Sequence, residues 1–411
     1  MGHLPRRKPT GDLALRCGVV VAVAAAALLL GLFAPSPLIP APATASAAHA
    51  HGQSLSIGLR QRLDGVLEAE LRRQGFPGVV AGVWMPRGRW VAARGVSDVR
   101  HQTPMRPRDH VRIGSVTKSF VTTELVQLAR AGRLSLHDPI SDYVKGVPNG
   151  RRMTLARLAN MTSGLFNYFS DRRWVVRYIL GRTFTPRELA MFGISHPPLF
   201  APGEAWDYSN TNTVLLGLVI RKVTDSPLRR VLQRHIFRPL GLQETSLPRT
   251  DRMPRPFAHG YSRQTRSGKV GDTTFNTPTA TWAAGGMVSN LFDLKRAAPT
   301  LGTGRPLLDP AWQRRREQWV TLPPNSRRQR YGIGLLDFHG WIGHNGGIPG
   351  YTTICWYLPQ RRITLVVEVN SDIHVGRSRP GYAYEPASEV AHRITKVITP
   401  HHVAPGAVKV R

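Results

Sequence analysis

The stretch Arg112-Ile113-Gly114-Ser115-Val116-Thr117-Lys118-Ser119-Phe120 decides how this chain is organised. Apolar side chains follow Ser115 at near-helical spacing, at Val116, Phe120, Leu125, Leu128 and Ala129. This spacing predicts an amphipathic helix, which Arg130 and Gly132 would end with a cation and a glycine. Ser115 and Lys118 are three residues apart, so a helix places both on one face.

A serine next to a lysine can do covalent chemistry. A serine hydroxyl is a poor nucleophile until a neighbour takes its proton, and a desolvated lysine can be that base. If Ser115 opens the helix, its hydroxyl lies near unpaired backbone N–H groups and the positive end of the helix dipole. The plain alternative is a helix-capping Ser115 followed by a solvated Lys118, and these four residues alone do not exclude it.

The chain is strongly basic. Its 411 residues allow a large core in one composite domain or two lobes. Lysine and arginine together occupy 56 positions against 25 acidic ones, and only eight of the 56 are lysine, which leaves 48 arginines. These arginines form no stripe with interleaved aromatics, so no specific nucleic-acid partner is expected. An arginine-biased composition and attraction to an anionic cell envelope both remain open.

The N-terminus predicts export. Basic residues at 6–8 precede the uncharged apolar run 18–34, and Ala45-Ser46-Ala47 follows as a small-residue cleavage site. We expect residues 1–47 to be a signal peptide and 48–54 a linker. The apolar run is 17 residues long, the lower limit for spanning a membrane, so a retained membrane anchor is the alternative.

Strand and helix patterns alternate along the rest of the chain. A helix is expected at 59–73, a β-hairpin from 79–84 and 90–93, helices at 155–161, 213–223, 228–237 and 385–398, and strands at 331–336, 352–358 and 363–370. Sheet patterns at both ends of the chain with helices between them predict an α+β fold. We expect a domain at 55–400, with a sheet lobe at 55–110 and 255–400, a helical lobe at 111–254 and a tail at 401–411.

Tyr208-Ser209-Asn210 lies in a polar loop before a predicted helix. A lysine ammonium beside a tyrosine favours the phenolate, so Tyr208 could relay a proton between the nucleophile and the leaving group. The Asn210 amide could bond a substrate carbonyl. A simple asparagine-rich helix cap is the alternative.

Residues 342–351 form a glycine-rich strand pattern that contains His344. Glycines in a strand let another backbone approach closely. A backbone N–H of this strand could then stabilise an oxyanion together with that of Ser115. His344 itself could be a cation, a donor or a structural histidine.

Taken together, the three motifs resemble those of the penicillin-recognising serine hydrolases. Their order is Ser-x-x-Lys, Tyr-x-Asn and His-x-Gly, starting at Ser115, Tyr208 and His344. This family contains secreted D-alanyl-D-alanine carboxypeptidases, class C β-lactamases and related esterases. The resemblance extends from about residue 78 to 370 and includes the segments 132–139, 158–165, 202–203, 283–287 and 331–335.

The resemblance implies a fold and a set of roles. The fold is a β-lactamase/transpeptidase-like antiparallel sheet flanked by helices, with a mostly helical lobe. The implied catalytic residues are Ser115 as nucleophile and Lys118 with Tyr208 as proton carriers. The implied substrate-binding residues are Asn210, His344, Asn345 and Gly347. The N–H groups of Ser115 and Gly347 would form the oxyanion hole, and neither a metal nor another cofactor is expected.

Two departures from the family bear on the substrate. Family members often carry threonine or serine where this chain has Asn345 and Gly347, so hydroxyl contacts to a substrate carboxylate are missing. The segment 335–339 before His344 also lacks a cation for such a carboxylate. We expect an exported acyl-serine hydrolase resembling a D-alanyl-D-alanine carboxypeptidase and acting on a small D-peptide. A β-lactam or ester substrate, or a non-catalytic envelope-binding protein on this fold, are the alternatives.

Overall fold

The computed structural model describes residues 55–322, 329–373, 382–383, 385–406 and 408–409. The predicted signal segment and linker therefore lie outside the described residues. None of the helices in these described ranges is long and apolar enough to cross a membrane.

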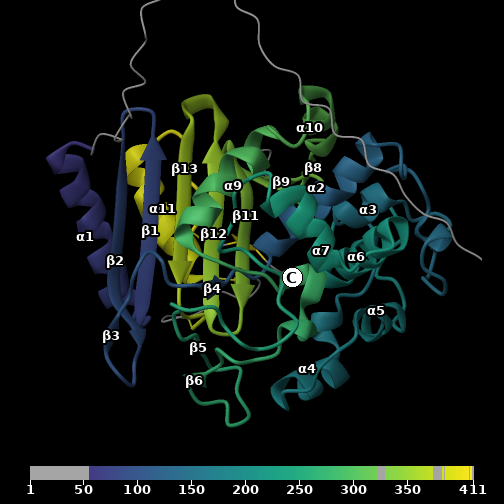
Figure 1. Ribbon diagram of the computed structural model, residues 1–411, viewed down its shortest axis with the longest axis horizontal. Helices are drawn as coiled ribbons and strands as arrows, with labels where there is room; N and C mark the ends of the chain where they lie inside the picture. Colours follow the sequence, from purple (N-terminus) through teal and green to yellow (C-terminus); the bar gives the residue numbers. More distant parts are fainter. Residues whose placement is uncertain (1–54, 323–328, 374–381, 384, 407, 410–411) are drawn as a thin grey trace, which may run out of the picture. The chain divides into compact units, whose positions relative to one another are not determined.

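A nine-stranded sheet forms the centre of the fold, with the order β3-β2-β1-β13-β12-β11-β10-β9-β8 (Figure 1). Every neighbouring pair is antiparallel. The strands are β1 (Gly78–Met85), β2 (Gly88–Asp98), β3 (Thr103–Pro104), β8 (Val320–Thr321), β9 (Gln329–Tyr331), β10 (Leu336–Phe338), β11 (Trp341–Ile348), β12 (Tyr351–Leu358) and β13 (Ile363–Val369). The β1–β2 hairpin joins the C-terminal strands through β13, where Val79 pairs with Val369. Strands from the two ends of the domain thus lie side by side in one continuous sheet.

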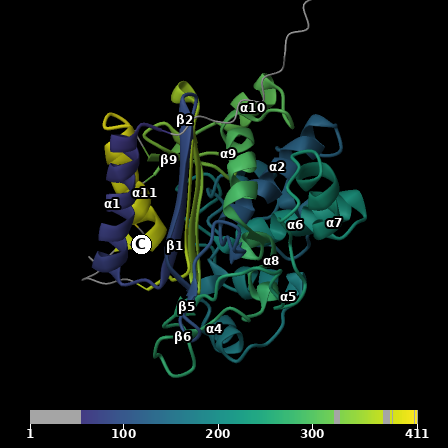
Figure 2. The ribbon, with the colours of Figure 1, turned by 60° about the vertical axis from the view of Figure 1, so that its left-hand side comes forward.

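Helices cover both faces of this sheet (Figure 2). On one face lie α1 (Ile57–Gln74) and α11 (Pro386–Ile398), which contact each other and the central strands. On the other face α9 (Leu291–Thr303) packs against β11, β12 and β13. Successive strand side chains point to opposite faces, so the buried apolar residues divide into two clusters. Ile354 belongs to the cluster beneath α11, and its neighbour Cys355 to the cluster beneath α9.

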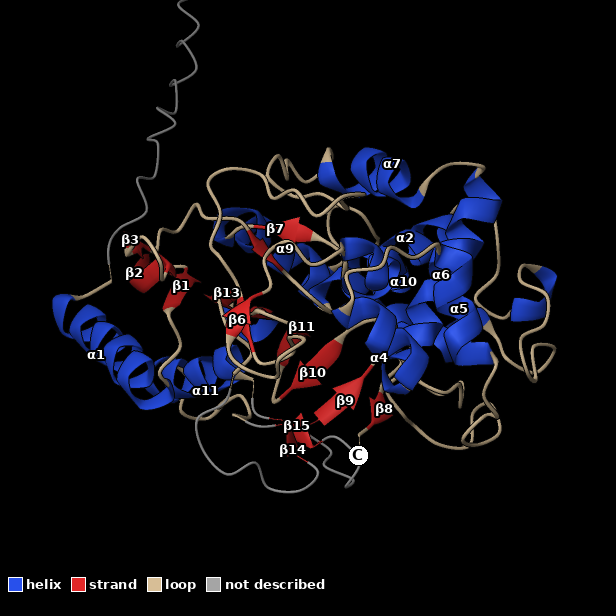
Figure 3. Cartoon of the chain, turned by 90° about the horizontal axis from the view of Figure 1, so that it is seen from below, coloured by secondary structure: helices blue, strands red, loops and turns tan. Residues whose placement is uncertain are grey.

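A group of helices lies beyond α9, on the same side of the sheet (Figure 3). It comprises α2 (Val116–Arg130), α3 (Leu155–Ala159), α4 (Arg172–Ile179), α5 (Pro186–Ile194), α6 (Asn210–Thr224), α7 (Leu228–Leu232), α8 (Trp282–Gly285) and α10 (Pro310–Arg316). The helix α2 is buried along nearly its whole length and contacts α6, α8 and β11. It therefore connects the helical group to the edge of the sheet.

Short strand pairs complete the fold. They are β4 (Val111–Arg112) with β7 (Val288–Ser289), β5 (Tyr261–Ser262) with β6 (Gly271–Asp272), and β14 (Tyr382–Ala383) with β15 (Val408–Lys409). All described residues belong to one unit. The predicted boundaries of the sheet lobe, the helical lobe and the tail stay predictions.

The predicted α+β fold is confirmed, and so is the helix after Ser115. The predicted strand at 331–336 is wrong, because β9 ends at Tyr331 and β10 begins at Leu336. Gly334 has φ +63° in the intervening turn, a conformation that glycine adopts without strain. The predicted helix at 213–223 begins earlier, at Asn210, and this places the Tyr-x-Asn motif at the start of a helix.

Candidate active site

Ser115 lies at the N-terminal end of α2 and is partly exposed, while Lys118 is completely buried. The Ser115 hydroxyl forms no capping bond to the helix. Instead, the Nζ atom of Lys118 lies 3.0 Å from the Oγ atom of Ser115. The alternative of a helix-capping serine with a solvated lysine is therefore wrong.

Lys118 has three hydrogen-bond partners. Besides Ser115, its Nζ atom lies 2.6 Å from the Oδ1 atom of Asn210 and 2.6 Å from the carbonyl oxygen of Ala284. Burial lowers the pKa of Lys118 well below its ordinary value, because desolvation disfavours the ammonium. A neutral amine has two N–H donors, which the two carbonyl oxygens accept, and one lone pair. In this neutral form the lone pair is left to accept the proton of the Ser115 hydroxyl at 3.0 Å, as a base for this hydroxyl requires.

Tyr208 lies beside this pair. The Nζ atom of Lys118 is 4.9 Å from the centroid of the Tyr208 ring. The Tyr208 hydroxyl is buried and has no regular hydrogen-bond partner among the described residues. Burial raises the pKa of Tyr208, although the nearby Ser115 hydroxyl lowers it, so Tyr208 is a neutral phenol rather than the phenolate that the sequence suggested. A neutral hydroxyl in this position can still pass a proton on.

Asn210 holds Lys118 in place. Its Oδ1 atom accepts from Lys118, and its Nδ2 atom donates to the Oδ1 atom of Asn167 at 3.1 Å. Both ends of the amide are thus engaged within the protein, and the predicted contact of Asn210 with a substrate stays a prediction. Asn167 was not foreseen, because it lies 43 residues before Asn210 and outside the three motifs.

The edge of β11 faces the start of α2. The neighbouring strand β10 pairs only with residues 341–343, so the edge from His344 onward is left without a strand partner on that side. Gly114, at φ +50°, packs directly on Gly347, where an added Cβ would lie 2.9 Å from the Gly347 nitrogen. An added Cβ at Gly346 would lie 3.1 Å from the nitrogen of Ser115. The backbones of Ser115 and Gly347 are therefore close together, and their role as an oxyanion hole stays a prediction.

His344 is 1% exposed. Its Nδ1 atom lies 2.5 Å from the carbonyl oxygen of Asn345, and its Nε2 atom lies 3.1 Å from the hydroxyl of Tyr331. Burial lowers the pKa of His344 to about 3, so the ring is neutral and not a cation. The ring centroid lies 6.3 Å from that of Tyr208. His344 thus packs behind Tyr208, and its predicted contact with a substrate stays a prediction.

The side chain of Asn345 meets a carboxylate that no sequence motif indicated. Its Nδ2 atom donates to the Oε2 atom of Glu385 at 2.6 Å. An added Cβ at Gly347 would lie 2.7 Å from the Oε1 atom of Glu385. Glu385 directly precedes α11, but its side chain makes no capping bond to this helix. Only its place before Pro386 was visible in the sequence, as the start of a predicted helix.

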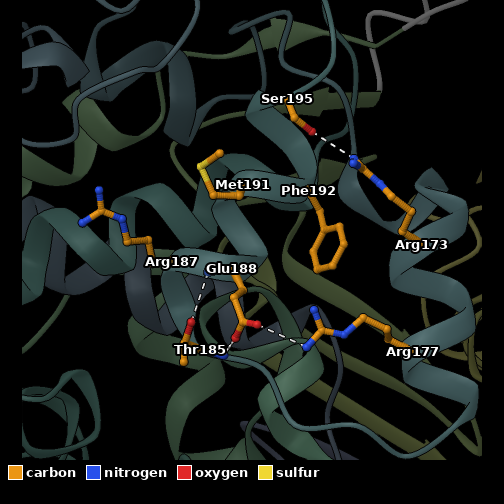
Figure 4. A pocket seen from close by; sticks show the side chains of 8 residues that line it. All are labelled: Arg173, Arg177, Thr185, Arg187, Glu188, Met191, Phe192 and Ser195. Carbon is orange, nitrogen blue, oxygen red and sulfur yellow. Dashed lines mark hydrogen bonds and ion pairs between the residues drawn. The ribbon is translucent and has the colours of Figure 1, made fainter.

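A separate surface hollow of about 440 Å³ lies between α4 and α5 (Figure 4). Two of the arginines that line it form ion pairs, Arg177 with Glu188 and Arg173 with Asp171. None of the candidate site residues lines it. Groups of three or more histidine, cysteine or acidic side chains that could hold a metal ion are absent from the described ranges, and the expected lack of a cofactor stays a prediction.

A family model described as Beta-lactamase matches residues 63–385, which is most of the chain and includes all of the candidate site residues. The chain belongs to the beta-lactamase family. The predicted family and its β-lactamase/transpeptidase-like fold are thereby confirmed.

Two curated relatives illustrate how this beta-lactamase family member resembles known proteins. It is 24% identical over 265 residues to the putative penicillin-binding protein PbpX of Bacillus subtilis (strain 168), covering 63% of this chain and 62% of the relative. It is 28% identical over 232 residues to protein flp of Staphylococcus aureus (strain MW2), covering 54% and 45%. The chain therefore spans less than two thirds of the length of either relative.

Two solved structures of amide-cleaving enzymes match nearly their whole length. A D-stereospecific amidohydrolase from Streptomyces sp. has a TM-score of 0.73 at 30% identity, covering 83% of this chain and 99% of that one. A D-amino acid amidase from Ochrobactrum anthropi SV3, complexed with L-phenylalanine amide, has a TM-score of 0.74 at 27% identity, covering 84% and 99%. Both enzymes therefore share the fold of this beta-lactamase family chain.

Proposed function

We propose that this protein is an exported serine hydrolase that cleaves small amides of D-amino acids through a covalent acyl-enzyme on Ser115. The observation that carries the proposal is the 3.0 Å contact between the Ser115 hydroxyl and the buried Lys118 amine. Membership of the beta-lactamase family supports it.

In the proposed mechanism, the Ser115 hydroxyl gives its proton to the neutral Lys118 amine while its oxygen attacks the amide carbon. The N–H groups of Ser115 and Gly347 stabilise the resulting oxyanion. Lys118 then returns the proton through the Tyr208 hydroxyl to the leaving amine, and the C–N bond breaks. Water attacks the acyl ester along the same proton path in reverse and releases the acid.

The amide substrate class is supported by the two structural neighbours. One is a D-stereospecific amidohydrolase and the other a D-amino acid amidase. A D-alanyl-D-alanine carboxypeptidase would have to place a substrate carboxylate near the strand at Asn345, where the carboxylate of Glu385 already lies. We therefore propose that the substrates are amides of D-amino acids rather than D-peptides that end in a free carboxylate.

Turnover of D-phenylalanine amide tests the proposal. We expect release of ammonia by the wild type, weaker release from L-phenylalanine amide, and a loss of at least about 10³-fold in Ser115→Ala. Turnover of p-nitrophenyl esters without turnover of any D-amide would favour the esterase alternative. Equal binding of wild type and Ser115→Ala to purified cell wall, with no turnover of amides, esters or β-lactams, would favour a non-catalytic envelope protein.

Export is proposed from the N-terminal sequence. A basic segment, an apolar run and the small residues at 45–47 support a signal peptide. Expression of the full chain in a bacterium, followed by N-terminal sequencing of the exported protein, tests this. A mature chain beginning at about residue 48 is expected, while activity confined to the cytoplasm would contradict export.

A further inference from the structure

The carboxyl group of Glu385 lies against the active-site strand and is not paired with a cation from the described part of the chain. Burial raises the pKa of Glu385, while hydrogen bonds from Asn345 and Ser388 lower it. The two oxygens of Glu385 lie at Asn345 and Gly347, which are two residues apart and so share one face of β11. Ser388 donates a further, long hydrogen bond of 3.4 Å. No ion pair among the described residues includes Glu385.

The surrounding residues are matched to this carboxylate. Gly347 has no side chain, and any Cβ there would lie 2.7 Å from the Oε1 atom of Glu385, so a larger residue would displace the carboxylate. The amide of Asn345 donates to its Oε2 atom at 2.6 Å. Glu385 is not needed as a helix cap, because its side chain makes no capping bond to α11.

The carboxylate is also close to the reacting groups. Gly347 packs on Gly114, the residue before Ser115. The side chain of Glu385 is therefore separated from the start of α2 only by the backbone of β11. Lys118 and His344 form no ion pair with Glu385 among the described residues, and burial lowers the pKa of both basic groups.

We propose that Glu385 sets the charge selectivity of the site, so that the enzyme accepts an ammonium group beside the scissile bond and rejects a carboxylate there. This rests on the proposed function of the site as an acyl-serine hydrolase. A half-buried carboxylate attracts an ammonium and repels a second carboxylate, and like charges placed together weaken binding strongly. The substrate class is then an amide of a D-amino acid with a free amino group and no carboxylate beside the bond that breaks.

Three substrates that differ in one charge each test the proposal. They are D-phenylalanyl-D-alanine amide, its N-acetylated form and the free dipeptide D-phenylalanyl-D-alanine. We expect the wild type to cleave the peptide bond between D-phenylalanine and D-alanine in the first substrate with a kcat/KM at least tenfold above that for the same bond in either of the others. In Glu385→Gln, at least one of these two ratios should fall tenfold or more.

Glu389→Gln is the matched control. Glu389 lies in α11 and pairs with Arg73 of α1, rather than with Asn345 of the strand. This variant should keep both ratios within threefold of the wild type. Ratios that remain within threefold in Glu385→Gln as well would assign Glu385 a structural role and overturn the proposal.

Two further outcomes keep the test decisive. A wild type that cleaves the free dipeptide and the acetylated amide as well as the parent amide overturns the proposal, even if Glu385→Gln does not fold. Turnover without charge preference leaves the hydrolase mechanism intact. Failure of the mechanism itself would appear differently, as no acyl adduct on Ser115 and no turnover of any of the three substrates.

Discussion

The Nζ atom of Lys118 lies 3.0 Å from the Oγ atom of Ser115, and its other two partners are carbonyl oxygens. When the amine is neutral, it can donate to these two carbonyl oxygens and accept from the hydroxyl, so the pair can transfer the serine proton to lysine. Burial lowers the pKa of Lys118 in the same direction.

Lys118→Met should remove this base while keeping the length of the side chain. We expect kcat/KM for a D-amino acid amide to fall by about 10²–10⁴-fold, the usual contribution of a general base. Circular dichroism should show an unchanged fold. Residual activity within tenfold of the wild type would contradict the role of Lys118.

Asn210→Asp should shift the pH dependence of the reaction. A carboxylate 2.6 Å from the Lys118 nitrogen would favour the ammonium and raise the pKa of Lys118. The acid limb of the kcat/KM profile should therefore move to higher pH by about one unit or more, with less activity at neutral pH. Asn149→Asp adds the same charge at an exposed position and should leave the profile in place. A shift toward lower pH in Asn210→Asp would refute the neutral-amine assignment.

Gly114 and Gly132 provide a matched pair at the two ends of α2. Both have positive φ, +50° and +67°, but Gly114 packs on Gly347 whereas an added Cβ at Gly132 meets nothing within 4 Å. Alanine at either position should cost about 1 kcal/mol or more of unfolding free energy, because positive φ strains a side chain. Only Gly114→Ala should also reduce kcat/KM, by about 10²-fold, since it displaces the strand that carries Gly347. Equal activities of the two variants would show that the packing of Gly114 on Gly347 is not needed.

The burial of His344 predicts that the free energy of unfolding depends on pH. Burial holds the pKa of His344 at about 3, against an ordinary 6.5, so below pH 6.5 the unfolded chain binds a proton that the folded one does not. The contribution of neutral His344 to stability is complete above the pKa that His344 has in the unfolded chain. It is lost as the pH falls toward the pKa that His344 has in the folded protein. In His344→Gln, the loss of unfolding free energy between pH 7 and pH 5 should be about 1–2 kcal/mol smaller than in the wild type. Urea unfolding at the two pH values measures it, and an equal loss in both proteins would mean that His344 does not titrate in this way.

Local patterns in the sequence were sufficient for most elements of the fold. The apolar spacing from Val116 to Ala129 predicted α2, and the β-branched runs predicted β12 and β13. The strand at 331–336 failed because the pattern did not reveal the tight turn at Gly334, whose N–H bonds the distant carbonyl of Ala159. Such a turn is fixed by a tertiary contact, which a local pattern does not contain.

The site was predictable where chemistry is carried by short motifs. The positions of Ser115, Lys118 and Tyr208 relative to one another follow from those motifs and their family resemblance. Glu385 was missed because it lies 40 residues beyond Asn345 and has no motif of its own. Strands from both ends of the domain form one sheet, and α11 packs on that sheet. This packing brings Glu385 to β11, and only the folded chain shows it.

The covalent acyl-enzyme is the central claim, and intact-protein mass spectrometry with peptide mapping measures it most directly. After reaction with a fluorophosphonate probe and, separately, with a penicillin, we predict one adduct per chain on the peptide that contains Ser115 from at least one of the two reagents, and none in Ser115→Ala. An adduct on another residue, or no adduct with either reagent in a folded protein, would contradict the account.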